Sequence, residues 1–420
     1  MRIMSQLSII QLLWATLVFG QYEDYDFEDE YEEPDHQQPY YFNPNTQAEV
    51  PPFPFPVHCA RECFCPPAFL LSMYCDHRKL KTIPNIPSHV QQLYLQNNDI
   101  EAVPAGPFAN VSFLREINLS HNKIKFHMID HGVFAKLSNL VQLHLQHNEL
   151  EELPFPLPSS LERLFLGFNR ISQLSRNALE GLPNITMLDL CNNLLDDPVL
   201  KGKPFSNMKS LMQLNLCNNK LQTMPPDLPL SLMYLSLENN SISSIPENYF
   251  NRLPKIIALR MSHNNLQNIP PNTFNLPNLL ELNLGHNKLK QVFYIPRSLQ
   301  HLYIEDNDME TINVTLMCPS IDPMNINQLT YIRVDQNKLT IPISTYAFFC
   351  FPHIRTIYYG EQHVNVNKST QLRTPVFRRF LTPEEYHEAE DYPETHDRET
   401  EDHEAEDNFS HLYFQQSNCC

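Results

Sequence analysis

A short pattern of leucines and an asparagine recurs along most of this sequence. It is clearest at 211–221, LMQLNLCNNKL, where leucines stand on both sides of Asn219. The middle of this stretch alternates apolar and polar residues with a period of two, which is typical of a half-buried strand. A single strand of this kind cannot bury its own apolar side chains, so it requires copies of itself on both sides.

Further copies are present on both sides of this stretch. Asparagines in the equivalent place follow an apolar pair at Asn98, Asn122, Asn148, Asn169, Asn193, Asn219, Asn240, Asn264, Asn287, Asn307 and Asn337, and a degraded copy ends the series at Ile354–Tyr359. A period of this length and composition predicts an α/β-type leucine-rich repeat solenoid of about twelve repeats over residues 77–381. We expect a curved parallel β-sheet on the concave face.

Each repeat has three parts with separate roles. The apolar pair should point into the core, and the residues flanking it should point onto the concave face. The repeat asparagine should lie inside the turn and hydrogen-bond backbone groups that are otherwise buried without a partner. Return segments such as IPENYFNRLPKI are rich in proline, which favours polyproline and short 3₁₀ segments on the convex face.

The two ends of the chain differ from the repeats. Residues 1–20 combine Arg2 with the apolar run 7–19, the pattern of a secretory signal peptide. No later apolar stretch is long enough to span a bilayer, so we expect a secreted protein without membrane insertion. Residues 21–58 and 382–420 are acidic and should be disordered tails, whereas the part between them carries a net charge of about +3.

Tyrosines embedded in the acidic tails are candidates for O-sulfation. Their neighbours are carboxylates, with almost no lysine or arginine, which is the usual setting of a sulfotransferase acceptor. The alternative interpretation is a purely solvated, repulsive tail. The strongest candidates are Tyr22, Tyr25 and Tyr31, and the weaker ones are Tyr386, Tyr392 and Tyr413.

Ten cysteines fit an oxidising compartment. Four of them, Cys59, Cys63, Cys65 and Cys75, lie in residues 59–76. Secretion argues against a zinc site there, and the first repeat needs a cap over its open apolar face, so we expect a disulfide-stapled N-terminal cap with three pairings open.

The remaining cysteines form three pairs along the chain. Cys318 and Cys350 bracket a long step near the end of the repeats, and we expect a disulfide that forms a C-terminal loop, 318–350. Cys191 and Cys217 occupy equivalent positions in adjacent repeats. Because parallel Cβ atoms stay farther apart than a disulfide prefers, free thiols are favoured over a bond between them. For the Cys419–Cys420 pair two interpretations stay open: a cross-link to another molecule, or capping by small thiols.

Asparagine sequons are numerous. Those predicted to carry N-linked glycans are Asn110, Asn118, Asn184, Asn239 and Asn313, and further sequons occur at Asn367 and Asn408. Asn118 should project onto the concave face, where a glycan would obstruct binding, whereas the other four predicted sites should lie at repeat edges.

The concave face is the candidate binding surface. Its outward positions mix charges, amides and aromatic rings, which suits a long protein ligand with charges of both signs. The C-terminal group richest in rings and charges consists of Tyr303, Glu305, Tyr331, Arg333 and Asp335. The alternative for any one residue is a merely solvated sheet face.

The sequence gives no support to an enzyme. There is no G-x-S-x-G, no glycine-rich phosphate loop and no H-E-x-x-H, and the histidines recur as a feature of the repeat. We therefore expect no catalytic residues, no cofactor and no metal centre, and the basic pair Arg378–Arg379 is too short to indicate nucleic-acid binding.

This sequence resembles the small leucine-rich proteoglycans in three features. They are the cap spacing Cys59-x3-Cys63-x-Cys65-x9-Cys75, the rhythm of short and long repeats, and the long step that contains Cys318. The nine-residue spacer and the acidic tyrosines are similar to the fibromodulin/lumican/keratocan class. The resemblance implies cap pairs of Cys59 with Cys65 and Cys63 with Cys75.

The resemblance also implies a function and a set of partners. It points to a keratan-sulfate-type proteoglycan of an extracellular matrix, with bone- or dentine-like mineralised tissue as the setting. The implied partners are fibrillar collagen on the concave face, hydroxyapatite or calcium on the acidic tails, an integrin on the cell surface and a possible homodimer. The alternative function is a soluble signalling regulator that sequesters a growth factor or engages a receptor.

Overall fold

The computed structural model describes residues 59–174, 179 and 181–363. The predicted signal peptide, both acidic tails, all six sulfation candidates and the Cys419–Cys420 pair lie outside the described residues.

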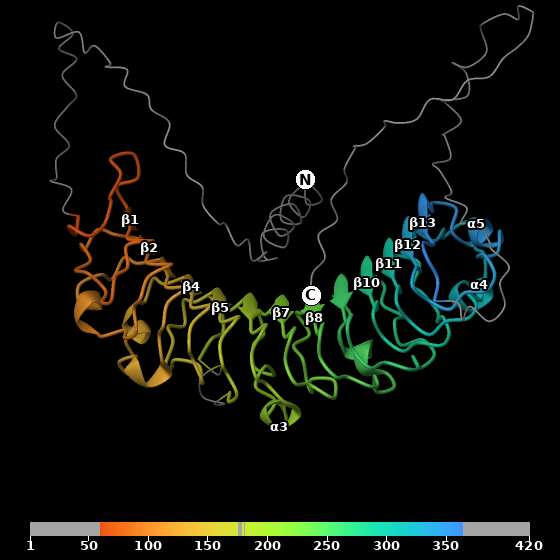
Figure 1. Cartoon of the computed structure of the whole chain (residues 1–420), viewed down its shortest axis with the longest axis horizontal. Coiled ribbons are helices and arrows are strands. Elements are labelled where there is room, and N and C mark those ends of the chain that lie inside the picture. Colours follow the sequence, from red (N-terminus) through yellow and green to blue (C-terminus); the bar gives the residue numbers. More distant parts are fainter. Residues whose placement is uncertain (1–58, 175–178, 180, 364–420) are drawn as a thin grey trace, which may run out of the picture. The chain divides into compact units, whose positions relative to one another are not determined.

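The described residues form one parallel sheet of thirteen strands, which follow one another in chain order along the inner side of a curve (Figure 1). The strands are β1 (Ser72–Tyr74), β2 (Gln92–Tyr94), β3 (Glu116–Asn118), β4 (Gln142–His144), β5 (Arg163–Phe165), β6 (Met187–Asp189), β7 (Gln213–Asn215), β8 (Tyr234–Ser236), β9 (Ala258–Arg260), β10 (Glu281–Asn283), β11 (His301–Tyr303), β12 (Tyr331–Arg333) and β13 (Thr356–Tyr358). The predicted solenoid is confirmed, with one strand for each of the twelve repeats and β1 added by the cap.

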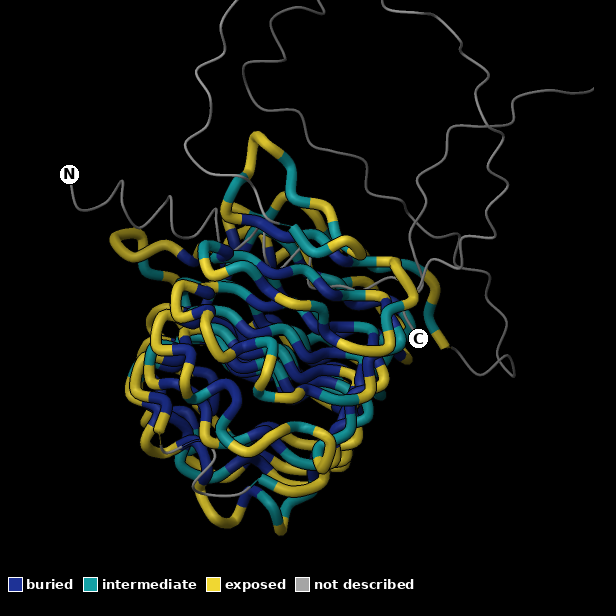
Figure 2. The backbone as a smooth tube through the Cα atoms, turned by 90° about the vertical axis from the view of Figure 1, so that its left-hand side faces the viewer, coloured by how far each residue is buried: buried dark blue, intermediate teal, exposed yellow. Residues whose placement is uncertain are grey.

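The alternation of side chains in each strand fixes the register. The central residue, such as Leu143 in β4 or Leu214 in β7, is fully buried, and each central residue pairs with the next across the sheet. A slip by one residue would turn every leucine out of the core. Buried backbone gathers inside the turns, and exposed backbone lies mostly on the outer loops (Figure 2).

Within residues 59–174, 179 and 181–363, the named helices of the return segments are all short, as the proline content predicted. The 3₁₀ helices are η1 (Gly106–Phe108), η2 (Phe126–Met128), η3 (Phe134–Lys136) and η4 (Tyr249–Arg252), and the single-turn α-helices are α3 (Asp197–Leu200), α4 (Val314–Met317) and α5 (Ala347–Cys350). They leave the sheet as the dominant surface on the concave side.

The repeat asparagines form a ladder through the turns. In Asn264, Oδ1 accepts the backbone N–H of Ile242 at 2.9 Å, and Nδ2 donates to three carbonyl oxygens, including that of Leu237 at 2.9 Å. The side chain therefore joins its own turn to the preceding repeat. This confirms that the asparagine satisfies backbone groups buried at the turn.

Three disulfides lie within the described residues. Cys59 is bonded to Cys65 and Cys63 to Cys75, which are the cap pairs implied by the family resemblance. The preference for free thiols at Cys191 and Cys217 is wrong, because the two are bonded with a Cα–Cα distance of 4.5 Å. The backbone is still paired at this point, because Leu190 and Asn192 donate to the carbonyl oxygens of Asn215 and Cys217, and the Cα–Cα distance lies within the range that a disulfide spans.

The predicted Cys318–Cys350 disulfide is not formed in this structure. Both thiols are buried side by side between α4 and α5, but each faces the backbone of the other. The Cys350 thiol lies 3.7 Å from the carbonyl oxygen of Cys318, and the Cys318 thiol lies 4.0 Å from that of Cys350. Burial is the main cause that raises the pKa of Cys318 to about 12. The two thiols are also close enough to interact with each other, because a hydrogen bond with the Cys350 side chain helps to raise the pKa of Cys318.

Candidate binding face of the repeat sheet

The in-register sheet aligns polar and aromatic side chains into rows across the concave face. One row at the C-terminal end joins Arg260, Asn283, Tyr303, Arg333 and Tyr358 through successive strand pairs. A parallel row, two residues earlier in each strand, contains Glu281, His301 and Tyr331. Strands β9 to β13 therefore present rings and charges as one continuous surface.

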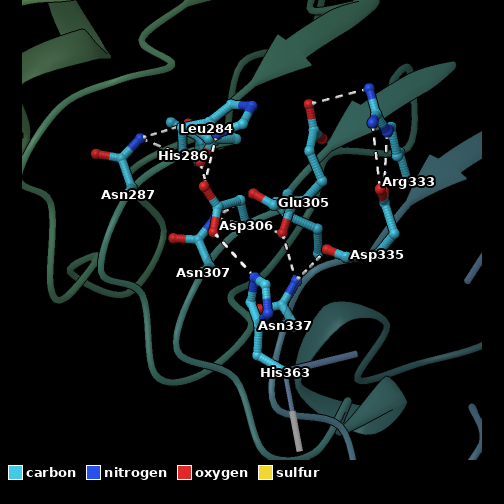
Figure 3. A network of polar contacts seen from close by, with 12 residues as sticks. Leu284, His286, Asn287, Glu305, Asp306, Asn307, Arg333, Asp335, Asn337 and His363 are labelled. Atoms are coloured by element: carbon cyan, nitrogen blue, oxygen red, sulfur yellow. Dashed lines mark hydrogen bonds and ion pairs between the residues drawn. The ribbon is translucent and has the colours of Figure 1, made fainter. Parts of the chain in front are cut away.

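Arg333 is the centre of a charged cluster on β12. Its Nε and Nη2 donate to the two carboxylate oxygens of Asp335 at 2.8 and 3.2 Å, and its Nη1 lies 3.6 Å from Oε1 of Glu305 (Figure 3). The two-point contact with Asp335 fixes the plane of the guanidinium. The hydrogen bonds that Arg333 donates to Asp335 are the main cause that raises the pKa of Arg333.

Both carboxylates of this cluster lie deeper than the sequence indicated. Glu305 is 4% exposed and Asp335 is 5% exposed, so neither stands out on the concave surface. Burial raises the pKa of Glu305. The structure therefore corrects their expected role: they hold Arg333 in place, and the side chains that a ligand can reach are the guanidinium and the neighbouring rings.

Aromatic rings surround this guanidinium. The ring centres of Tyr303 and Tyr331 are 5.4 Å apart, and the guanidinium carbon of Arg333 lies 5.5 Å from the centre of the Tyr358 ring. Tyr303 and Tyr331 are half-buried, whereas Tyr358 is exposed. The structure thus adds Tyr358 to the predicted group. Tyr358 pairs with Arg333 in the register of β12 and β13. This pairing can be inferred from the sequence only if the last, degraded repeat is aligned with the others.

A second ion pair extends the cluster toward the middle of the sheet. Arg260 Nε lies 2.8 Å from Oε1 of Glu281 on the next strand, and both side chains are partly exposed. Both residues flank the buried central leucine of their strands, so the repeat pattern puts them on the concave face, outside the predicted C-terminal group. Opposite charges on consecutive strands were the signal that could have identified the pair.

The turns that follow these strands carry a separate polar network. Asp306 lies between two histidines, with its carboxylate oxygens 2.7 Å from Nδ1 of His286 and 3.8 Å from Nε2 of His363 (Figure 3). The His263 ring stacks on the His286 ring at 4.0 Å. Among residues 59–174, 179 and 181–363, no group of three or more His, Cys, Asp or Glu has the arrangement of a metal site.

Two titratable groups of the concave face, Asp189 on β6 and His144 on β4, have pKa values that are shifted mainly by burial. Burial raises the pKa of Asp189 to about 6, although its Oδ1 accepts the backbone N–H of Cys191 at 3.0 Å. Burial also lowers the pKa of His144 to about 4, and its ring stacks on Phe165 at 4.3 Å. The two shifts couple protonation to folding with opposite signs.

The five glycosylation candidates occupy two kinds of position. Asn110, Asn184, Asn239 and Asn313 are exposed on turns or return segments. Asn118 is half-buried in β3 on the concave face, and its Oδ1 accepts hydrogen bonds from the backbone N–H and the hydroxyl of Ser120. Their predicted placement is therefore observed, and their occupancy stays a prediction.

Comparison with known proteins agrees with this architecture. The leucine rich repeat model matches residues 88–150, 155–195, 230–289 and 259–309, and the leucine rich repeat N-terminal domain model matches 58–87. Bovine (Bos taurus) osteomodulin is 59% identical over 94% of this chain and 94% of its own length. Bovine keratocan is 43% identical over 71% of this chain and 88% of its own.

This chain belongs to the small leucine-rich proteoglycans. These proteoglycans of the extracellular matrix are in general not enzymes. Within the described part of this member, no helix combines the length and apolar character needed to cross a membrane. The repeat fold also extends outside the family. A chain from the solved octameric complex of Latrophilin 3, Unc5D and FLRT2 (LRR) is similar with a TM-score of 0.58 and 25% identity over 72% of this chain and 84% of its own.

Proposed function

We propose that this small leucine-rich proteoglycan binds fibrillar collagen with the C-terminal half of its concave face. The observation that carries this proposal is the row of tyrosines and arginines across β9 to β13. Collagen is a thin, extended ligand whose side chains project outward and carry both charge signs. A curved sheet with rings and paired charges offers such a ligand many contacts along its length.

The cluster around Arg333 is suited to be the anchor of this interface. Its guanidinium is oriented by Asp335 and Glu305 before any ligand arrives, so little side-chain entropy is lost on binding. Tyrosine and arginine are also the side chains that most often dominate protein interfaces. A collagen carboxylate could pair with Arg333 while Tyr331 and Tyr358 cover the adjacent apolar groups.

Collagen binding by two variants tests this interface. Arg333→Gln removes the positive charge and Tyr331→Ala removes a ring, and each should weaken binding to reconstituted collagen fibrils by about tenfold. Tyr94→Ala is the matched control, because Tyr94 has the same repeat position as Arg333 at the far end of the sheet. Circular dichroism and thermal melting would establish that the variants are folded.

Two results would contradict the proposal. One is unchanged collagen binding by both folded variants. The other is a pull-down from bone matrix that recovers a stoichiometric growth factor and no collagen, which would favour the soluble signalling regulator.

The acidic tails complete the proposed function. Residues 383–420 contain thirteen Asp and Glu and one Arg, and carboxylates are preferred ligands of Ca²⁺. Many weak contacts from one tail to a hydroxyapatite surface would add through avidity. Deleting 383–420 should therefore lower retention on hydroxyapatite while leaving collagen binding intact, and equal retention would contradict a role for this tail.

The remaining parts of the proposal concern modification and cells. From the family and the sequence we also propose keratan-sulfate-type chains at the exposed sequons and sulfated tyrosines in the tails. The same grounds support integrin-mediated cell adhesion and secretion into a mineralised matrix. Peptide mass mapping of the secreted protein would test the modifications, and attachment of cells with and without an integrin-blocking antibody would test adhesion.

A further inference from the structure

A second candidate site lies at the opposite edge of the same strands. A pocket of about 520 Å³ opens where β11, β12 and β13 begin, whereas Glu305 and Asp335 follow the ends of their strands. It is lined by Gln300, His301, Gln328, Thr330, Tyr331, His353, Arg355 and Thr356. Its walls therefore supply amides, hydroxyls, imidazoles and a guanidinium, and no carboxylate.

The cation in this pocket is available to a ligand. Arg355 is exposed, and it has no ion pair with another of the described residues. The nearby Arg297, in contrast, is engaged by the Asn325 carbonyl oxygen and by Asp322 at 3.7 Å. Glu281, which pairs in register with His301, is occupied by Arg260 at 2.8 Å. An anion at Arg355 would therefore not compete with an existing carboxylate partner.

The rest of the pocket indicates the chemistry of that anion. The rings of His301 and Tyr331 lie side by side, with centres 6.3 Å apart, and offer a partly apolar wall. The Thr330 hydroxyl bonds to the Gln300 carbonyl at 3.0 Å, which fixes the floor of the pocket. Polar groups near ring faces suit a hydroxyl-rich sugar, and a guanidinium suits a sulfate or carboxylate group on it.

We propose that this pocket binds a sulfated saccharide, with Arg355 holding the sulfate group and the His301–Tyr331 wall contacting the sugar ring. This site shares Tyr331 with the proposed collagen contact, but its cation, Arg355, is not part of that contact and the proposal does not depend on it. It would let one concave sheet engage a protein fibre and a sulfated glycan at different edges.

The experiment measures binding of a fluorescent chondroitin 4-sulfate hexasaccharide to the full-length secreted protein by anisotropy. Arg355→Gln should weaken binding by at least about tenfold, since hydrogen bonds to charged groups are the strong ones. Gln328→Ala should weaken it less. Arg115→Gln should leave it unchanged, because Arg115 is also exposed and directly precedes a strand, but at the other end of the sheet.

The outcomes separate a built site from general charge attraction. The proposal is supported if the wild-type protein prefers the sulfated hexasaccharide over its unsulfated form and only the pocket variants lose this preference. It is overturned if the wild-type protein does not bind the sulfated probe, if it binds both probes equally, or if the folded Arg115→Gln and Arg355→Gln variants lose equal affinity. Collagen binding by Arg355→Gln should stay at the wild-type level, which distinguishes this test from that of the proposed function.

Discussion

The Cys191–Cys217 disulfide provides the sharpest test of the energetics of this sheet. The two cysteines are 26 residues apart, so the bond closes one complete repeat in the unfolded chain. For a loop of that length, the chain-entropy account gives a stabilisation of about 3.5 kcal/mol at 25 °C. We therefore expect the double variant Cys191→Ala, Cys217→Ala to be less stable than the wild-type protein by roughly this amount.

The assay is urea denaturation followed by circular dichroism under non-reducing conditions. Variants are preferable to a reductant, because a reductant would also open the two cap disulfides. Each single variant should lose about as much stability as the double variant, since either substitution removes the same cross-link. Cysteine alkylation without reductant, followed by mass mapping, should leave both positions unlabelled in the wild-type protein.

Either of two results would refute this reasoning. If the double variant unfolds within about 1 kcal/mol of the wild-type protein, the bond does not constrain the unfolded chain as calculated. If both cysteines are alkylated in the unreduced wild-type protein, the bond is absent.

Three further predictions concern groups buried in the repeats. Asn264→Ala should lower the free energy of unfolding by about 3 kcal/mol, because it leaves several buried backbone groups without partners. The control is Asn278→Ala, which removes an exposed side chain with one hydrogen bond and should cost under about 1 kcal/mol. Urea denaturation measures both values. Burial raises the pKa of Asp189 to about 6, so its contribution to stability should fall by about 2–3 kcal/mol as pH rises from 4 to 6. Burial lowers the pKa of His144 to about 4, so its contribution should rise by up to ~3 kcal/mol as pH rises from 4 to about 6.5. The two contributions largely offset each other in the wild-type protein, whose stability should change little over this range. Asp189→Asn should therefore give a stability that rises with pH, and His144→Phe should give one that falls with pH; a profile of either variant that runs parallel to that of the wild-type protein would count against the corresponding assignment.

The sequence was sufficient to predict the fold because the same physical requirement repeats about twelve times. Buried leucines and a turn asparagine such as Asn264 are needed in every repeat, so strand positions, face assignment and register follow from alignment of the copies. The number of repeats and the short convex helices followed for the same reason.

Features that depend on side-chain direction at a single place were not predictable in this way. Cys191 and Cys217 lie on paired backbone with Cα atoms 4.5 Å apart, which is within the range that a disulfide spans, so the direction of their side chains decided whether a bond forms. Glu305 and Asp335 alternate as outward residues should, yet they turn toward Arg333 and become buried. Repeat periodicity specifies the face of the sheet from which a side chain projects, and local charge pairing determines how deeply that side chain is buried.

The most direct test of the central proposal is hydroxyl-radical footprinting of tyrosines with and without collagen fibrils. Tyr358 is exposed and Tyr331 is half-buried at the proposed contact, whereas Tyr94 is half-buried at the other end of the same face. Collagen should protect Tyr331 and Tyr358 from oxidation and leave Tyr94 unchanged. Protection of Tyr94 with Tyr331 and Tyr358 still fully reactive would contradict binding through the C-terminal half of the concave face.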